Sequence, residues 1–274
     1  MASAPTVNLP LFYKDLMPLN LRDHKDWRSR RAEAATWLVG QHAVPLTVDE
    51  FPLAQRHFPI VFSVGENPVP LALFGLNEGV NVYVDDKGTI TEDIYLPAYV
   101  RRYPFLLARL DSNSDNMSLC FDPSTGLLGD HKDGDELFAA DGPSDFTKGV
   151  LQFCENFEQA GQRTQIFVAE LRKHDLLMEG EVAIQRTNAG EDAQPFVYRG
   201  FKMINQEKFR EVRGDQLRTW NQNGFLALVH AHLLSLDLLR VIFARQTGLG
   251  KGPGAELPNG QAAEKKPKKA KKQG

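Results

Sequence analysis

Cysteine is scarce in this chain, whose 274 residues include only Cys120 and Cys154. Both stand in apolar stretches, so we expect two buried free thiols, with a disulfide as the alternative. This usage excludes a disulfide-rich scaffold and is typical of a reducing compartment.

A secretory signal would show a basic start followed by a continuous apolar core, and the first residues have neither. We therefore predict a cytoplasmic location.

A long uninterrupted hydrophobic run is also missing. The most apolar stretch, residues 224–244, contains His230, His232, Asp237 and Arg240. A spanning helix needs roughly 20 mostly apolar residues, and each central charge costs about 2.5–3.5 kcal/mol. We predict a buried core helix here and no transmembrane segment, which excludes a membrane permease.

The signatures of well-known catalytic sites are absent from the sequence, which has no G-x-S-x-G, no H-E-x-x-H and no dinucleotide-binding fingerprint. The acidic residues 130–136 lack the order of a calcium loop, and the glycine-rich residues 248–254 lack the Ser or Thr of a phosphate loop. His230 and His232 would point about 200° apart on a helix, which disfavours a shared metal. We predict no catalytic residue, no metal site and no cofactor.

Charge divides the chain into two parts. Seven lysines and two glutamates give residues 251–274 a net charge of +5, which leaves −8 on residues 1–250 of a chain whose total is −3. The acidic body argues against a broad nucleic-acid surface. The tail composition predicts a disordered basic segment over 248–274. That tail either contacts nucleic acid or anionic surfaces, or serves only solubility.

The remaining composition, 42% apolar and 24% charged with 17 phenylalanines, is that of a globular protein with a well-filled core. Short apolar runs separated by turn residues predict an antiparallel β meander or barrel-like sheet between residues 59 and 121. The runs are 59–64, 69–74, 80–84, a short strand from 89, 105–110 and 117–121. Strict alternation over 80–84 predicts one wet face, whereas the first two strands are expected to be buried on both faces.

Helices are predicted mainly in the C-terminal part, which gives an α+β fold with C-terminal helices packed on the sheet. Ser144 or Asp145 begins a helix, and a second one is expected over 163–175. A short helix capped by Gly40 is expected within 23–40, one helical turn over 97–102, and a mobile acidic loop over 129–142. A β-hairpin is expected to pair 182–186 with 196–201. Further helices are expected over 206–212, over 216–221 with Asp215 as the cap, and in the apolar stretch that ends at 243. Residues 1–22 are expected as an extended arm. We predict a single domain over 1–247, with a subdivision near 140 as the alternative.

The most distinctive segment is Pro97-Ala-Tyr-Val-Arg-Arg-Tyr-Pro-Phe105. Guanidinium groups bind carboxylate or phosphate in bidentate fashion, so Arg101 and Arg102, set between Tyr99 and Tyr103, predict an anion-accepting cleft. The alternative is that both arginines pair with local acids while the tyrosines pack. The expected partner is a small anionic ligand or a protein. Asp122, His230 and His232 are further candidate ligand contacts.

The segments 44–62, 97–105 and 224–236 together resemble the bacterial SapC family, and the resemblance extends over about residues 10–245. It implies an accessory role connected with surface layers or with nutrient and glycan uptake, and it brings no catalytic residues. Some members carry a permease label that conflicts with the polar residues of 224–244. The lysine-rich tail lies outside the resemblance.

Three hypotheses follow from these observations. The first is a non-enzymatic binding or accessory protein that uses the arginine cleft. The second is an enzyme whose site is assembled from distant residues, with His57, Asp122, His230 or His232 as candidates. The third is a structural surface-layer subunit, which the absence of a predicted signal disfavours.

Overall fold

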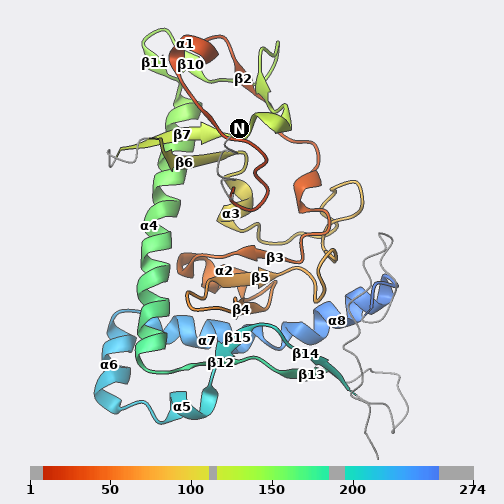
Figure 1. Cartoon of the computed structure of the whole chain (residues 1–274), viewed down its shortest axis with the longest axis vertical. Helices are drawn as coiled ribbons and strands as arrows, with labels where there is room; N and C mark the ends of the chain where they lie inside the picture. Colours follow the sequence, from red (N-terminus) through yellow and green to blue (C-terminus); the bar gives the residue numbers. More distant parts are fainter. Residues whose placement is uncertain (1–8, 111–115, 185–194, 253–274) are drawn as a thin grey trace, which may run out of the picture.

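A computed structural model describes residues 9–110, 116–184 and 195–252 (Figure 1). The fold is α+β, as predicted: several small antiparallel sheets and a set of helices are arranged along one long helix. This helix, α4 (Asp145–Lys173), has 29 residues and runs along one side of the molecule from top to bottom in Figure 1. The small sheets lie beside its first half, and the largest sheet lies beside its second half.

The largest sheet has five strands in the order β12-β15-β4-β5-β3. They are β12 (Leu177–Glu179), β15 (Lys202–Ile204), β4 (Ile60–Phe62), β5 (Pro70–Leu73) and β3 (Ala43–Pro45). The predicted neighbours β4 and β5 do pair antiparallel, and β4 is buried throughout. The expected meander and barrel are wrong, because β15 joins from much later in the chain and none of the described strands closes the sheet into a barrel.

Three smaller antiparallel sheets occupy the upper part. One contains β1 (Met17–Pro18), β7 (Met117–Phe121) and β6 (Phe105–Arg109), another contains β8 (Leu128–Gly129), β2 (Arg28–Ser29) and β9 (Asp135–Glu136), and the third contains β10 (Phe138–Ala139) and β11 (Gly142–Pro143). The predicted pairing of β6 with β7 is confirmed, while its loop, 111–115, lies outside the described residues. Because β1 pairs with β7, the extended N-terminal arm lies on the body from residue 9 onward.

The shorter helices are α1 (Leu21–His24), α2 (Phe51–Ala54), α3 (Ala98–Arg101), α5 (Gln206–Arg210), α6 (Gly214–Gln222), α7 (Phe225–Ser235) and α8 (Leu238–Gly248). Three 3₁₀ turns cover Thr36–Leu38, Val48–Glu50 and Pro123–Thr125, and a separate hairpin pairs β13 (Val182–Ile184) with β14 (Phe196–Tyr198). The helical turn at α3, the hairpin, α5 and α6 agree with prediction. The expected cap does not: Arg213 precedes α6, and Asp215 lies in its first turn.

Hydrophobic side chains form one large and two small clusters. The large cluster fills the space between the five-stranded sheet, α7, α8 and the second half of α4, where Phe167 packs edge-on against Phe51. The first half of α4 contributes Cys154 to a smaller cluster with β6 and β7. A single helix therefore belongs to two cores. The thiols of Cys120 and Cys154 are free and buried, as predicted.

Residues 80–84 do not form the predicted half-wet strand. All five are buried, and the only ladder contact described there is an isolated bridge between Val84 and Ile90. The polar position is satisfied inside the protein, because the Asn81 amide donates to the Leu38 carbonyl and accepts from the Tyr83 backbone N–H. The polar residue in the alternating pattern of 80–84 is therefore a buried, hydrogen-bonded asparagine, and it does not mark a solvent-exposed face.

Two expected breaks in regular structure are also wrong. The two helices predicted around Ser144–Phe157 and 163–175 are one continuous helix, which Ser144 caps by accepting from the Thr147 N–H. Gly161 lies inside it, and the clusters at both ends hold the helix across this weak position. The loop expected over 129–142 contains the short strands β9 and β10, and β8 and β11 overlap its two ends. Its acids Asp133 and Glu136 form ion pairs with Arg30 and Arg28.

The helix predicted in 23–40 is absent over most of that range. Only Leu21–His24 is α-helical; Arg28–Ser29 then enters a sheet, and Thr36–Leu38 forms a 3₁₀ turn. Gly40, at φ +73°, does follow this turn in the left-handed conformation that suits glycine. Because β8 and β9 pair with both sides of β2, the strand hydrogen bonds outweigh the local helical preference.

The apolar C-terminal stretch forms two successive helices rather than one buried helix. By length and composition, Phe225–Gly248 is apolar enough to cross a membrane, and a third of its most apolar window is buried. Its inner face is tied to β4 and to the loop after β5: the Ser235 hydroxyl accepts from the Ile60 N–H, and Gln246 accepts from the Leu76 N–H. Its outer face is exposed at Leu234 and Val241. Core helices of folded proteins share this length and composition.

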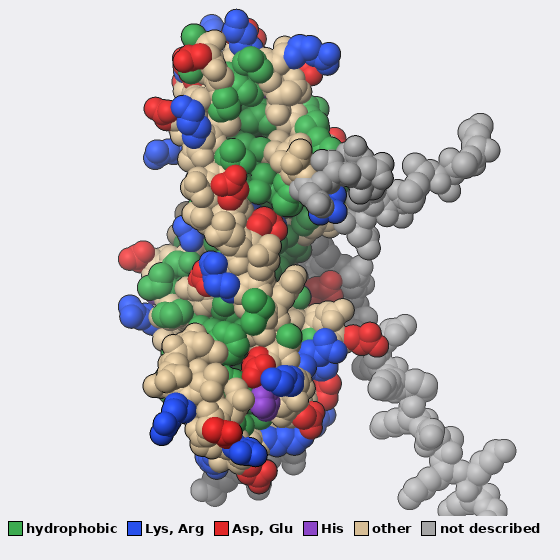
Figure 2. Space-filling view, turned by 90° about the vertical axis from the view of Figure 1, so that its left-hand side faces the viewer, with side chains coloured by type: hydrophobic (Ala, Val, Ile, Leu, Met, Phe, Trp, Pro, Cys, Tyr) green, Lys and Arg blue, Asp and Glu red, His purple; other side chains and the backbone are tan. Residues whose placement is uncertain are grey.

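Figure 2 shows the side of the molecule on which α4 and α6 lie. Acidic and basic side chains alternate over its lower half, and hydrophobic side chains gather in its upper half. Charge of one sign does not dominate this face.

Candidate ligand-binding site

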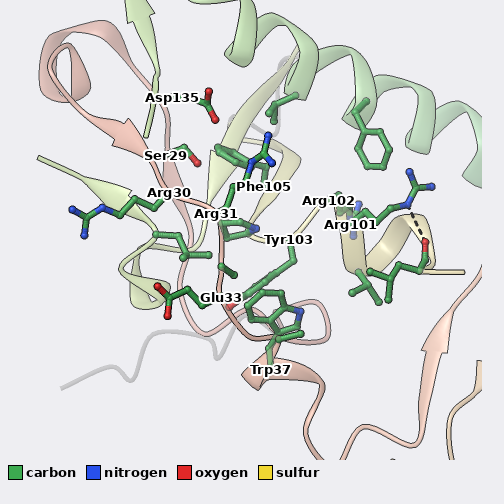
Figure 3. Close-up of a pocket in the computed structure, with 18 of the residues that line it drawn as sticks. Ser29, Arg30, Arg31, Glu33, Trp37, Arg101, Arg102, Tyr103, Phe105 and Asp135 are labelled. Atoms are coloured by element: carbon green, nitrogen blue, oxygen red, sulfur yellow. Dashed lines mark hydrogen bonds between the residues drawn. The ribbon is translucent and has the colours of Figure 1, made fainter. Parts of the chain in front are cut away.

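A cavity of about 1000 Å³ opens between three segments that are far apart in the sequence (Figure 3). One wall is the irregular segment 29–37, another is the turn from α3 into β6 at residues 100–105, and the third is the first half of α4 between Asp145 and Cys154. The predicted residues Arg101, Arg102 and Tyr103 all line it.

Glu50 fixes the position of α3. Its carboxylate is buried and accepts from the Ala98 N–H at 2.5 Å, where α3 begins, and from the Tyr95 hydroxyl at 3.0 Å. Its second oxygen accepts from the backbone N–H and the hydroxyl of Thr47, which completes a capping box. Four donors therefore satisfy one buried charge and hold the turn that carries the two arginines.

Arg101 lies at one end of the cavity. Its Nε donates to the Leu96 carbonyl at 2.9 Å and its Nη2 donates to the Tyr95 hydroxyl at 3.2 Å, and the guanidinium lies over the Phe153 ring (Figure 3). These partners orient the guanidinium without neutralising it. The alternative that Arg101 pairs with a local acid is therefore not what the structure shows.

Arg102 is buried, with 7% of its surface exposed. Its guanidinium is stacked between the rings of Phe157 and Tyr99, at 4.2 and 4.6 Å from their centroids. Its only acid partner among the described residues is Glu158, at 3.4 Å, which is long for a charged hydrogen bond. Its Nε is buried and has no hydrogen-bond partner in the described part of the chain.

Arg31 and Trp37 complete the donor set, and sequence reasoning missed both. The Arg31 side chain reaches toward Phe105 in Figure 3, and no described residue makes a hydrogen bond or ion pair with it. The indole Nε1 of Trp37 is buried and has no hydrogen-bond partner among the described residues. The Nε of Arg102 is in the same situation. The neighbouring Arg30 pairs with Asp133 and points away from the cavity.

Three acids also line the cavity. Asp145 pairs with Lys148 on α4, whereas Glu33 and Asp135 make no ion pair with any described residue. In Figure 3, both unpaired acids lie on the side opposite to Arg101. Arg31 lies on that side as well, so arginines occur along the cavity while Glu33 and Asp135 occur only at the end away from Arg101. Apolar side chains cover the wall between the two ends, notably Phe146, Val150 and Phe153 of α4.

The tyrosines and Asp122 support the site from behind. The Tyr99 hydroxyl donates to the Leu11 carbonyl, and the Tyr103 hydroxyl donates to Asp122. Burial would raise the pKa of Asp122, but hydrogen bonds from Lys14, Ser124 and Tyr103 together hold the pKa below its usual value. Asp122 thus anchors the N-terminal arm to the turn that carries Tyr103.

The two histidines lie elsewhere. His232 is fully buried between the strands: its Nε2 accepts from the Ile204 N–H, so its Nδ1 donates to the Ile60 carbonyl. Burial lowers its pKa to about 4. His230 is exposed and packs edge-on against Phe209. Neither lines the cavity.

The residues proposed for an assembled catalytic site do not converge. His57 contributes its backbone carbonyl to the Tyr83 hydroxyl, and none of the interactions in the described residues joins any two of His57, Asp122, His230 and His232. The described residues also hold no group of three His, Cys, Asp or Glu side chains suited to a metal ion. The observed geometry favours binding by arginines over acid–base chemistry at these positions.

A second cavity of about 600 Å³ lies on the other side of Tyr99 and Phe157, the two rings that sandwich Arg102. It is lined mainly by apolar residues at the start of β5 and on the second half of α4, including Val69, Pro70 and Val168. Arg102 therefore lies against the aromatic partition between the two cavities.

Comparison with protein families gives one match, the SapC family, over residues 19–242. The comparisons with curated proteins and with solved structures found no match. The family match covers more than half of the chain, including α3, the segment 29–37 and all of α4. This chain is therefore a member of the SapC family.

Proposed function

We propose that this SapC-family protein is a non-enzymatic binding or accessory protein that holds a small ligand with one anionic group in the cavity between α3 and α4. The observation that carries the proposal is the set of donors around the cavity that have no acceptor among the described residues. Arg31 is exposed to solvent and pairs with no acid among the described residues, whereas Arg102 and Trp37 each keep a buried donor without an acceptor there. A carboxylate or phosphate supplies the acceptor atoms that these groups lack.

The acids at the opposite end limit the charge of the ligand. Glu33 and Asp135 would repel a polyanion that filled the cavity, whereas a single anionic group at the Arg101 end avoids them. A donor or cationic group at the far end of the ligand would pair with these carboxylates. This arrangement favours a small monoanion or zwitterion over a nucleic acid.

The rest of the ligand is expected to be apolar. Phe146, Val150 and Phe153 present hydrocarbon along α4, and Trp37 faces them from the opposite wall. Burial of apolar surface stabilises a complex by about 25 cal/mol per Å² before the costs of ordering are counted. The free, buried thiols support a cytoplasmic location, and the link to surface layers or nutrient uptake stays a prediction from the family resemblance.

A matched pair of probes tests the proposal. Phenylacetate carries an anionic group on an aromatic body, and phenylacetamide replaces only the charged group. We expect phenylacetate to raise the melting temperature of the purified chain in a concentration-dependent way, while the amide gives little shift. Isothermal titration should give a stoichiometry near one for the carboxylate.

Variants separate the cavity from general anion binding. Arg31→Gln and Arg101→Gln together remove two charges without emptying the core, and should abolish the phenylacetate shift. Arg199→Gln serves as the control, because Arg199 is an exposed, ion-paired arginine that does not line the cavity. A shift that persists in the double variant, or that disappears equally in the control, would contradict the assignment.

A further inference from the structure

The outer face of α7 and α8 carries exposed aliphatic side chains that the binding site does not use. Leu234, Val241 and Leu249 are 69%, 41% and 55% exposed. They are separated by seven and eight residues, which is about two helical turns each time. Leu236 and Asp237, at the junction, both keep right-handed helical backbone angles, so the spacing places the three side chains on one side of a nearly continuous helix.

The opposite side of the same helices is committed to the protein interior. Leu239, Ile242 and Phe243 are buried, and His232 and Ser235 hydrogen-bond to the backbone of the sheet. The helix pair therefore cannot leave the body without breaking these contacts. It can contact an external surface only through its exposed side; Figure 1 shows the two helices crossing the lower part of the molecule.

A block of positive charge follows this helix directly in the sequence. Lys251 comes three residues after α8 ends, and Lys265, Lys266, Lys268, Lys269, Lys271 and Lys272 follow. In the sequence, Lys265 follows Lys251 by 14 residues. The lysines are consequently tethered to the end that carries Val241 and Leu249.

We propose that this surface docks on an anionic lipid bilayer, with the aliphatic side chains of α7 and α8 entering the headgroup region and the lysines of the tail contacting acidic headgroups. Aliphatic side chains at helical spacing beside clustered lysines are the features of peripheral membrane attachment. Arg240, exposed on α8, adds positive charge there, and Asp237 is the one acid at the helix junction. Nucleic acid is the weaker candidate, because Leu and Val offer no ring on which bases stack.

Vesicle co-sedimentation of the full chain tests the proposal. The two vesicle types are phosphatidylcholine alone and phosphatidylcholine with about a quarter phosphatidylglycerol, each at about 0.1 M and about 0.5 M NaCl. We expect partitioning to the anionic vesicles to exceed that to neutral ones by roughly tenfold or more at low salt, and to fall at high salt. Replacing the six lysines from Lys265 to Lys272 by Gln should lower it by roughly tenfold.

The helix face is tested separately. Leu234→Ser with Val241→Ser should weaken partitioning by roughly threefold or more at unchanged tail charge. Ile166→Ser is the matched control, because Ile166 is an aliphatic side chain of α4 with 60% exposure, and it should partition like the unmodified chain. Absence of binding to anionic vesicles, or equal binding by the Leu234/Val241 variant, would overturn the proposal. Tighter binding to a DNA duplex than to the vesicles at the same salt would overturn it as well.

Discussion

Protonation of His232 should make the stability of this protein depend on pH between about 6.5 and 4. The folded state holds the neutral ring, with Nε2 accepting from the Ile204 N–H and Nδ1 donating to the Ile60 carbonyl. A proton on Nε2 would place two N–H groups against each other in a buried site. Burial therefore lowers the pKa of His232 to about 4 from an ordinary value of 6.5.

The sign and size of the effect follow from proton linkage. Between about pH 4 and pH 6.5 the unfolded chain binds a proton at His232 that the folded chain does not, so stability falls as the pH falls through this window. One pKa unit corresponds to about 1.4 kcal/mol, so lowering the pH from about 7.5 to about 5 should cost about 2 kcal/mol. The full loss of about 3 kcal/mol is reached near the folded pKa, below which the penalty stays constant.

Urea unfolding at several pH values measures this slope. His232→Gln removes the titrating group, so its free energy of unfolding should fall by about 2 kcal/mol less than that of the unmodified chain over the same interval. His230→Gln is the matched control, because His230 is an exposed histidine of the same helix. Parallel curves for the unmodified chain and His232→Gln would refute the reasoning. An NMR titration in which the His232 ring protonates above about pH 6 would refute it without any variant.

Three further outcomes follow from the described contacts. Glu50→Ala leaves four donors without an acceptor, including the Ala98 N–H that starts α3, and should lower the free energy of unfolding by about 4 kcal/mol, measured by urea titration. Asp122→Ala should free the N-terminal arm, so limited proteolysis should cut the arm earlier than in the unmodified chain. Burial raises the pKa of Cys154 to about 11 and also raises that of Cys120, so neither thiol should react with Ellman's reagent until the chain is unfolded; rapid labelling of the native protein would contradict this.

Local signals in the sequence were sufficient where structure is local. The β6–β7 hairpin, the turn at α3 and the helix α5 were all predicted from short patterns of apolar and turn residues. Each of these elements makes its main hydrogen bonds within a short span of chain. In such cases the period of the pattern and the terminating residues decide the outcome.

Prediction failed where distant parts of the chain set the environment. The alternating residues around Asn81 predict a half-exposed strand, because nothing local shows that the Leu38 carbonyl supplies an acceptor. The long helix α4 was divided near Gly161 because the two hydrophobic clusters that hold it together are invisible in its own sequence. Both errors come from tertiary contacts that outweigh local propensity.

The sequence predicted one wall of the candidate site and not the wall that faces it. The paired arginines of α3 were identified because adjacent guanidinium groups between tyrosines are an unusual pattern. Arg31 and Trp37 were missed because they lie about seventy residues earlier, in a segment expected to be helical. The doublet of Arg30 and Arg31 was a signal of the same kind, and only the fold shows that one of its members faces the cavity.

The walls of the cavity should differ in mobility. Segment 29–37 is attached by the Arg30 N–H to the Leu127 carbonyl and by the Ala35 N–H to the Gly88 carbonyl, and the backbone N–H groups of residues 31–34 make no hydrogen bond to any described residue. The facing wall is α4, whose backbone N–H groups are hydrogen-bonded within the helix.

Amide hydrogen exchange should therefore be fast at 31–34 and slow along Val150–Cys154, since exchange follows local opening. Phenylacetate should slow exchange at 31–34 only, because Arg31 would gain an anionic partner and its segment would lose freedom. Equal protection of both walls in the free protein would show that the cavity is rigid on all sides, and adjustment of the segment 29–37 around the ligand would then not be part of binding.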